Sequence, residues 1–182
     1  MTDRIDIMID LETLGLGYDA PILSIGAAVI ANREVTLGGY HEGISLKDSI
    51  AEGCVPSAST IEWWLRQAPE AQLALAAKIA GGERLLAVLR DFANWVRGYP
   101  GAYVWGNGAD FDIAMLRHAF AKMGIDEPWS YRNVRCFRTY MAEFGRDEDW
   151  VQPTVKHDAL ADARAQAQTL LNCRKRLGVK HD

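Results

Sequence analysis

The sequence contains few cysteines, and none of them lie close together. Cys54, Cys136 and Cys173 are the only three, and no C-x-x-C motif is present. This spacing argues against a disulfide scaffold and against a zinc site. We therefore expect three buried thiols that behave as small apolar side chains.

Long hydrophobic runs and targeting signals are also missing. The most apolar run, residues 21–31, is too short to cross a bilayer. Residues 1–10 carry acids early and lack the pattern of a cleavable signal peptide. These absences predict a cytoplasmic protein that does not enter a membrane.

Positive charge is not in excess. The formal net charge is −4 at pH 7, whereas a protein that coats nucleic acid non-specifically is expected to be basic. The 182 residues contain no internal repeat and no low-complexity linker, and they are enough to bury one sizeable core. We expect a single domain over residues 1–182.

The hydrophobic pattern predicts five strands. Alternation indicates a first strand at residues 4–11, and an apolar run indicates a second. The segment "ANRE" is a plausible turn into a third strand, which would complete an antiparallel meander. The segments "AYVWGNG" and "YRNVRC" are the expected fourth and fifth strands. The strands after the first are expected at residues 22–30, 35–44, 102–108 and 131–136.

Helices are expected between the later strands. A Ser59–Glu62 capping box and Pro69 predict two helix starts. The apolar spacing and the glycines that end each segment predict further helices at residues 83–98, 111–123, 137–143 and 159–177. The order of elements predicts an α/β fold. Its mixed central sheet would combine a three-stranded antiparallel meander with parallel strands, and helices would flank it.

Acidic residues stand where these elements begin or end. Asp10 and Glu12 end the first strand, and a period of two places both side chains on one face. Asp112 follows the bend Gly106-Asn107-Gly108, whose glycines permit a tight turn and close approach of a ligand. Asp110 is the competing residue, but on a helix it would point about 200° away from Asp112.

His157 and Asp162 form the third group. His157 would lie in the loop before the last helix and Asp162 in that helix, so that both face one pocket. Asp158 is expected to cap the helix. Each group taken alone is more often structural: an acid pair at a strand end, an acid at a helix start, an ordinary histidine. Their combination in this order is what indicates a catalytic site.

The segments "DLET", "NGADFD" and "HDALAD" resemble the three motifs of the DEDDh (DnaQ-like) family of 3′–5′ exonucleases. The segments "APILSIGAAVI", "STIEWWLRQAPEA" and "VRCFRTY" extend the resemblance to a compact bacterial and phage subgroup with exoribonuclease-like members. The resemblance implies a ribonuclease-H-like fold and one 3′–5′ exonuclease domain.

The resemblance also implies a mechanism. Asp10, Glu12, Asp112 and Asp162 would hold two divalent ions, Mg²⁺ or Mn²⁺, and His157 would accept the proton of the attacking water. The product would be a nucleoside 5′-monophosphate.

Residues that touch the substrate are expected around this centre. By analogy with the family, the turn Thr13-Leu14-Gly15 would meet the terminal nucleotide, and Leu14 would wedge against the last base. A simple turn is the equally weighted alternative. Of Trp63 and Trp64, one is expected in the core and the other stacking on a base. The residues predicted to bind substrate are Thr13, Leu14, Gly15, Trp64, Asn107, Phe111, Arg135 and Arg138.

The expected partner is the 3′ end of a single strand, with RNA favoured over DNA on the subgroup resemblance alone. A homodimer is a further expectation. Two other functions stay open. One is a catalytically weak module that binds nucleic-acid ends or a protein on the same fold. The other is a metal-dependent phosphatase or nucleotide hydrolase that does not act on polymers.

Overall fold

A mixed five-stranded sheet forms the centre of the computed structural model, which describes residues 4–179. The strand order is β3-β2-β1-β4-β5. β1 pairs antiparallel with β2, and β2 with β3, while β4 pairs parallel with both β1 and β5. The strands are β1 (Asp6–Thr13), β2 (Ile22–Ala31), β3 (Glu34–Gly43), β4 (Tyr103–Gly106) and β5 (Val134–Cys136). The predicted meander and the predicted parallel strands are confirmed.

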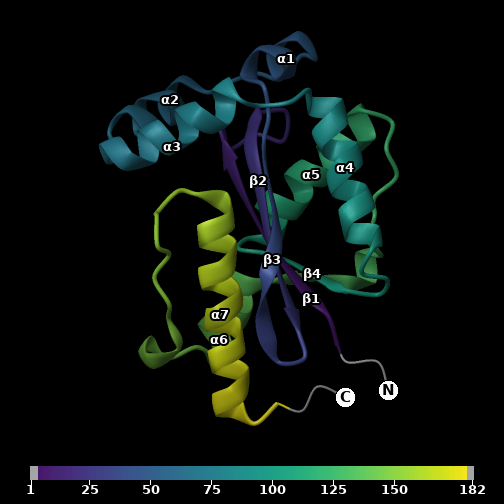
Figure 1. Ribbon diagram of the computed structural model, residues 1–182, viewed down its shortest axis with the longest axis vertical. Helices are drawn as coiled ribbons and strands as arrows, with labels where there is room; N and C mark the ends of the chain where they lie inside the picture. The colour runs from purple at the N-terminus through teal and green to yellow at the C-terminus, as the bar shows by residue number, and fades with distance from the viewer. Residues whose placement is uncertain (1–3, 180–182) are drawn as a thin grey trace.

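Helices cover both faces of this sheet (Figure 1). α4 and α5 pack on one face, α6 and α7 pack on the other, and the α2–α3 hairpin projects beyond the end of the sheet. The helices are α1 (Leu46–Ala51), α2 (Ala58–Leu65), α3 (Pro69–Ala80), α4 (Leu85–Arg97), α5 (Ala114–Lys122), α6 (Phe137–Phe144) and α7 (Ala159–Leu177).

The alternation of β1 divides the core into two layers. Ile7 and Ile9 pack with α4 and α5, whereas Met8 packs with α6 and α7. Asp10 and Glu12 share the parity of Met8, so both carboxylates lie on the α7 face of the sheet. This is the arrangement that the period of two predicted.

α7 has the bounds that its sequence predicted. Asp158 is the N-cap and accepts a hydrogen bond from the Ala161 backbone N–H at 3.0 Å. Gly178 ends the helix with a φ of 64°, a conformation that suits a residue without a β-carbon. The longest helix of the described chain is therefore defined at both ends by local chemistry, and this fixes where Asp162 lies.

Two local predictions are wrong. α2 begins one residue after Ser57, not at a Ser59–Glu62 capping box, because the Ser57 backbone N–H donates to the Leu14 carbonyl and fixes the start of the helix. The predicted helix at residues 111–123 is preceded by a π-helical turn, Ala109–Ile113, and becomes regular at α5. α1 was not predicted at all.

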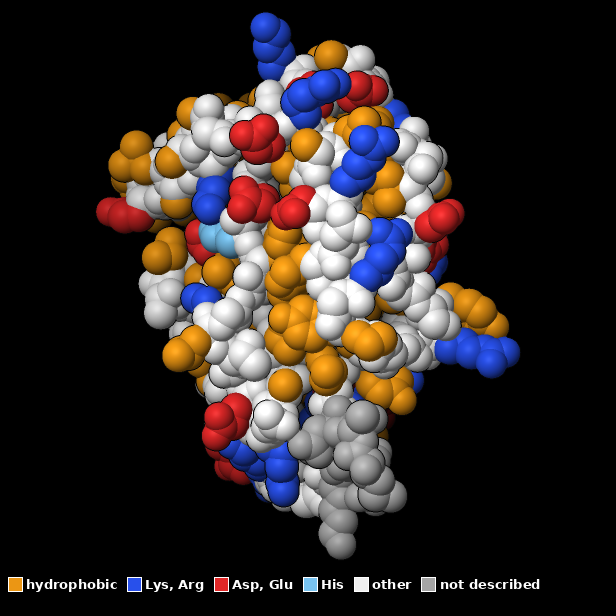
Figure 2. Space-filling view, turned by 45° about the vertical axis from the view of Figure 1, so that its right-hand side comes forward, with side chains coloured by type: hydrophobic (Ala, Val, Ile, Leu, Met, Phe, Trp, Pro, Cys, Tyr) orange, Lys and Arg blue, Asp and Glu red, His pale blue; other side chains and the backbone are white. Residues whose placement is uncertain are grey.

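The thiols are also less uniform than expected. Cys173 is buried, but Cys54 and Cys136 are half-buried. Acidic and basic side chains are interspersed around a narrow apolar strip on the face drawn in Figure 2, in keeping with the small net charge. Across residues 4–179, no helix combines the length and the apolar character needed to cross a membrane.

Candidate active site

Three separate elements bring the predicted acids together. Asp10 and Glu12 come from the end of β1, Asp112 from the π-helical turn after β4, and Asp162 from the first turn of α7. β1 is in register with β4 up to the Ile9–Gly106 pair, which carries the two strand ends to the same edge of the sheet. The fold therefore collects at one place residues that are up to 152 positions apart in the sequence.

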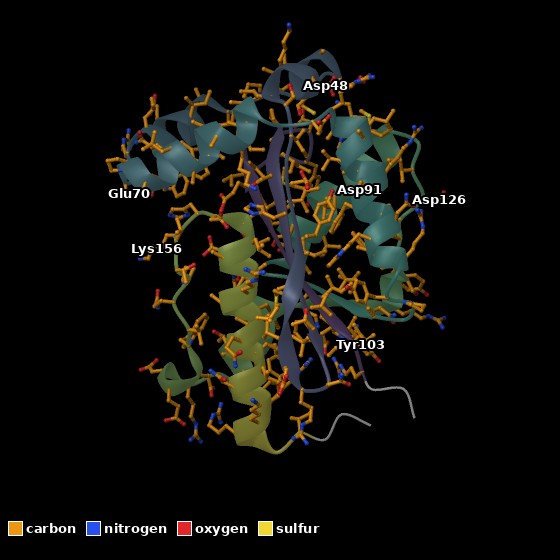
Figure 3. The ribbon with its side chains drawn as sticks, viewed as in Figure 1. Asp48, Glu70, Asp91, Tyr103, Asp126 and Lys156 are labelled. Carbon is orange, nitrogen blue, oxygen red and sulfur yellow. The ribbon has the colours of Figure 1, made fainter. Side chains whose placement is uncertain are left out.

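His157 lies directly beside two of these acids. Ligand atoms of Glu12, His157 and Asp162 all lie within 4.8 Å of one another. The loop that carries His157 leads into α7 below the α2–α3 hairpin, where Figure 3 labels the preceding residue, Lys156. The structure therefore brings His157 and Asp162, which the sequence assigned to one pocket, close together.

His157 has an unusual backbone conformation, and its ring lies against two aromatic side chains. Its φ is 61°, in the left-handed region, which is costly for a residue with a side chain. Its ring makes edge-on contacts with Trp63, at 4.9 Å between centroids, and with Trp64, at 5.9 Å. Both tryptophans therefore touch the histidine.

The glycine bend admits Asp112 as predicted. Asp112 is buried and accepts a hydrogen bond from the Gly108 backbone N–H at 3.3 Å. A β-carbon on Gly106 would lie 3.0 Å from the Asp112 carboxylate, so a larger residue would push this acid aside. Asp110 lines the same cavity, which differs from the prediction that the two acids diverge, but Asp110 is exposed.

Burial and mutual repulsion disfavour the charged forms of the β1 acids. Burial first, then the charges of Asp112 and Glu12, raise the pKa of Asp10 well above its ordinary value. Burial, followed by the charges of Asp162, Asp158 and Asp112, raises the pKa of Glu12 to about 8. These carboxylates are therefore short of positive charge.

The other two acids show the same deficit. Burial raises the pKa of Asp112 to about 6, although hydrogen bonds from backbone N–H groups oppose the rise. Burial also raises the pKa of Asp162. The ion pairs found within residues 4–179 engage none of the four site acids with lysine or arginine. Clustered carboxylate oxygens that are not ion-paired with cationic side chains suit hard divalent cations.

Two adjoining cavities open beside the acids. The first, of about 610 Å³, is lined by Asp10 and Asp112. The second, of about 400 Å³, is lined by Glu12 and by apolar and aromatic side chains. Both are lined by Leu11, Leu16 and Phe111, so these residues mark the boundary between them. A polar, acidic cavity thus adjoins a mainly apolar one.

The turn after β1 is built differently from the prediction. Leu14 is buried in a core cluster with Leu23 and Leu75, so the predicted wedge is wrong. Leu16, two residues later, is 77% exposed and lines both cavities. The sequence offers no signal that separates Leu14 from Leu16, since the packing of α2 and α3 decides which of them is covered.

Thr13 and Gly15 serve the turn in different ways. Thr13 lines the second cavity, and its hydroxyl donates to the Gly15 carbonyl at 2.8 Å. A β-carbon on Gly15 would lie 2.7 Å from the Ala20 side chain, so only glycine fits there without a shift.

The tryptophan pair divides into a core residue and an exposed one. Trp64 is buried, and its indole N–H donates to the Thr13 carbonyl at 3.0 Å, although part of it lines the second cavity. Trp63 is 42% exposed and lines the same cavity. The tryptophan available for stacking is therefore Trp63, whereas Trp64 was the residue chosen from the sequence.

Of the remaining residues predicted to bind substrate, three line the first cavity and one does not. Asn107, Phe111 and Arg138 line the first cavity. Arg135 does not reach it: its guanidinium donates to the Val134 carbonyl at 2.8 Å and lies 4.5 Å from the centre of the Tyr103 ring. Tyr103 is at the start of β4, well away from the loop that carries Lys156 (Figure 3).

Besides Leu16 and Trp63, the sequence-based prediction missed Gln166. Gln166 lies one helical turn after Asp162, and its Nε2 donates to Asp10 Oδ1 at 2.8 Å. The i, i+4 spacing from Asp162 is the signal that could have found it, because such residues share one face of a helix.

Residues 5–173 match the model of a family described as the 3′-5′ exoribonuclease Rv2179c-like domain. The chain belongs to this family. The match covers nearly the whole sequence and supports nuclease activity. No curated protein matches the chain.

Solved structures of exonuclease I have the same fold. A zinc-bound complex of E. coli exonuclease I with single-stranded DNA aligns with a TM-score of 0.73 and 16% identity, covering 96% of this chain and 41% of that one. E. coli exonuclease I with a labelled dT13 oligonucleotide gives a TM-score of 0.70 and 15% identity, covering 97% and 42%. A product-bound exonuclease I gives 0.69 and 14%, covering 97% and 45%.

The chain therefore spans less than half the length of these exonuclease I chains. At such identities the likeness establishes the fold, and the predicted ribonuclease-H-like architecture is confirmed. Together with the family match, it confirms the predicted relationship to the DnaQ-like 3′–5′ exonucleases.

Proposed function

We propose that this protein is a metal-dependent 3′–5′ exonuclease that removes nucleoside 5′-monophosphates from the ends of single strands. One exonuclease domain over residues 1–182 would carry the activity. The observation behind the proposal is a set of four carboxylates from three elements, beside a histidine. Within residues 4–179 none of the four is ion-paired with lysine or arginine. Structural acids in a core are normally paired, so this arrangement favours a ligand that brings positive charge.

The donor set fits two divalent ions. Asp10, Glu12, Asp112 and Asp162 offer the hard oxygen ligands that Mg²⁺ and Mn²⁺ prefer. Such ions, when bound, would activate water and neutralise charge that builds on the phosphate. Acids with raised pKa values must lose their protons before they can bind a metal ion. The affinity for metal should therefore depend on pH.

The chain's own residues supply the rest. His157 would accept the proton of the attacking water, with its ring held by Trp63 and Trp64. Arg138, exposed at the first cavity, suits a phosphate, and Asn107 supports its segment by accepting from the Arg138 backbone N–H at 2.9 Å. Thr13 and Gly15 would present the turn to the terminal nucleotide.

The terminal base would enter the apolar cavity. Leu16 and Phe111 lie at the boundary between the two cavities, where the terminal base would leave the path of the phosphates. Trp63 offers an exposed ring on which a base can stack. Arg135 is left out of this proposal because its guanidinium is engaged with Val134 and Tyr103.

RNA is the proposed substrate. The family description names an exoribonuclease, while the solved structures of similar fold include complexes with single-stranded DNA. DNA is therefore the competitor that an experiment must include. The homodimer and the cytoplasmic location expected from the sequence stay predictions. A sedimentation measurement that shows only monomer would contradict the first.

The test compares matched RNA and DNA single strands labelled at the 5′ end. We expect shortening from the 3′ end with Mn²⁺, none with chelator, and faster shortening of RNA. His157→Ala should lower the rate by about 10²–10⁴-fold, the usual contribution of a general base. His118→Ala is the matched control, because His118 is exposed on α5.

Two other functions predict different results. If the chain were a binding module, the wild type would bind the strands without cleaving them, and Asp10→Ala with Glu12→Ala would leave binding unchanged. If it were a nucleotide hydrolase, it would release phosphate from mononucleotides and leave both strands intact. Either result would overturn the proposal.

A further inference from the structure

Gln166 places a buried amide between α7 and the acid cluster. Its Nε2 donates to Asp10 Oδ1 at 2.8 Å. Its Oε1 is buried and, over residues 4–179, has no hydrogen-bond partner. A buried acceptor without a partner is costly and is normally avoided in a core. The amide NH₂ of Gln166 is therefore hydrogen-bonded, whereas its carbonyl oxygen is not, at the edge of the acid cluster proposed to bind metal.

The orientation of this amide follows from its neighbour. In the ionised form that binds a metal ion, the Asp10 carboxylate has only acceptors, so the NH₂ group of Gln166 faces it, as in the structure, and the amide carbonyl faces away. Rotating the amide would set two acceptors against each other. The unpartnered Oε1 is therefore a consequence of holding Asp10.

An ion pair at the far end of the contact between β1 and α7 sets the register between this strand and this helix. The Arg174 guanidinium donates to Asp6 Oδ2 at 2.7 Å, with both side chains buried. Four strand residues from Asp6 to Asp10 rise about 13 Å, and eight helical residues from Arg174 back to Gln166 rise about 12 Å. The two lengths agree, so the ion pair between Arg174 and Asp6 brings Gln166 opposite Asp10.

We propose that Gln166 is a positioning residue for the metal centre, an inference that rests on the proposed function. It holds Oδ1 of Asp10 and leaves Oδ2 of the same carboxylate free for the ion. Its unpartnered Oε1 would accept a hydrogen bond from a water molecule in the occupied site. Groups that orient a metal ligand in this way commonly contribute about 10–100-fold to metal affinity or activity.

The test replaces the amide with an apolar group of similar shape. Gln166→Met removes both the donor and the acceptor. Gln168→Met is the matched control, because the Gln168 amide bonds Asn172 on the same helix at 2.9 Å. Mn²⁺ binding is measured by titration calorimetry without nucleic acid. We expect the dissociation constant to rise by about 10–100-fold for Gln166→Met and to stay unchanged for the control.

Two further readouts separate positioning from general stability. The rise in melting temperature on replacing chelator by Mn²⁺ should shrink for Gln166→Met, since this difference cancels effects on the metal-free protein. On RNA, kcat should fall while KM stays constant. Gln166→Asn, which keeps an amide but is one methylene too short, should behave like Gln166→Met and serves if the methionine variant does not fold.

A double-mutant cycle with Asp10 gives the decisive outcome. In an Asp10→Asn background, Gln166→Met should have no further effect on Mn²⁺ binding. An equal effect in both backgrounds would overturn the inference, as would unchanged Mn²⁺ binding by Gln166→Met and Gln166→Asn when the wild type binds Mn²⁺ and cleaves. A wild type that neither binds Mn²⁺ nor cleaves would overturn the proposed function as well.

Discussion

Buried carboxylates at the two ends of the contact between β1 and α7 have opposite electrostatic surroundings. Asp6, at the start of β1, receives hydrogen bonds from Arg174 at 2.7 Å and from the Trp105 indole at 2.7 Å. Burial alone would raise the pKa of Asp6, but the hydrogen bonds and charge of Arg174 bring it below the ordinary value. This end of the contact is complete without any ligand.

The other end is incomplete. Asp10 and Glu12 lie on the same face of the same strand, yet burial and neighbouring acids raise their pKa values. The strand, the face and the helix are shared, so the difference lies in the neighbours. Asp6 receives hydrogen bonds from Arg174, Arg4 and Trp105, whereas Asp10 and Glu12 lie beside other acids. A buried acid is a structural element when it has a cationic partner, and it indicates a binding site when it has none.

The largest expected effect breaks the incomplete end. Glu12→Gln should lower exonuclease activity at least about 10²-fold, since a carboxylate ligand of the proposed metal ions is lost. It should also raise the melting temperature of the metal-free protein at neutral pH, because the free-energy cost of keeping this buried acid at a raised pKa disappears. Glu62→Gln, an exposed acid on α2, is the control. A metal-free Glu12→Gln protein less stable than the wild type would contradict the comparison.

At the complete end, removing a charged group should destabilise the protein instead of stabilising it. Arg174→Met leaves Asp6 buried without its main partner and should cost about 3–5 kcal/mol of unfolding free energy. Replacing both residues, Asp6→Leu with Arg174→Met, should cost much less because no unpaired charge is left. Urea denaturation with chelator measures both effects. Equal losses in the single and double variants would show that packing, not charge, holds this end.

A pH series sharpens the contrast between the ends without mutation. Glu12 titrates at about 8 in the fold, above its unfolded value, so the folded state binds more protons between these values. The metal-free protein should therefore lose stability as pH rises from about 5 to 8, by a few kcal/mol at about 1.4 kcal/mol per pKa unit. Excess Mg²⁺ should flatten this slope. A flat metal-free profile over this window would contradict the raised pKa.

For Asp6 we expect the reverse: its contribution to stability is lost as the pH falls. Its pKa is depressed in the fold, so its contribution is present above the unfolded value and is lost as pH falls through the folded one. The Arg174→Met variant should therefore lose part of the acid sensitivity that the wild type shows below about pH 4. Unfolding free energies at pH 2–5 measure this.

The smallest expected effect concerns only the incomplete end. Leu16→Ala should raise KM for RNA several-fold while changing stability by less than about 0.5 kcal/mol, because the side chain is exposed. Leu14→Ala should instead cost about 2–5 kcal/mol of stability, as buried leucines do. An unchanged KM for Leu16→Ala would remove this residue from the proposed substrate path.

Local patterns were enough to predict most of the elements. Alternation located β1 and placed Asp10 and Glu12 on one face, because this periodicity is a property of any strand. Asp158 and Gly178 defined α7 through capping, which involves only near neighbours. The glycine bend announced the close approach of Asp112. These signals do not depend on what packs against the segment.

Predictions that needed distant neighbours were less successful. The choice between Leu14 and Leu16 depended on Leu23 and Leu75 covering one of them. Trp64, not Trp63, became the core residue because its indole N–H reaches the Thr13 carbonyl. These choices were made by contacts between elements, about which a local pattern carries no information.

By itself, the sequence determined the order of the strands and helices, the identity of the catalytic candidates and the family to which they point. The tertiary structure alone decided which carboxylate has a cationic partner. Asp6 and Asp10 look alike in the sequence, as two acids on one face of a strand. Arg174, 168 residues from Asp6, neutralises the first, whereas Gln166 offers the second only a neutral amide. Electrostatic compensation acts through space, so only the folded chain can assign it.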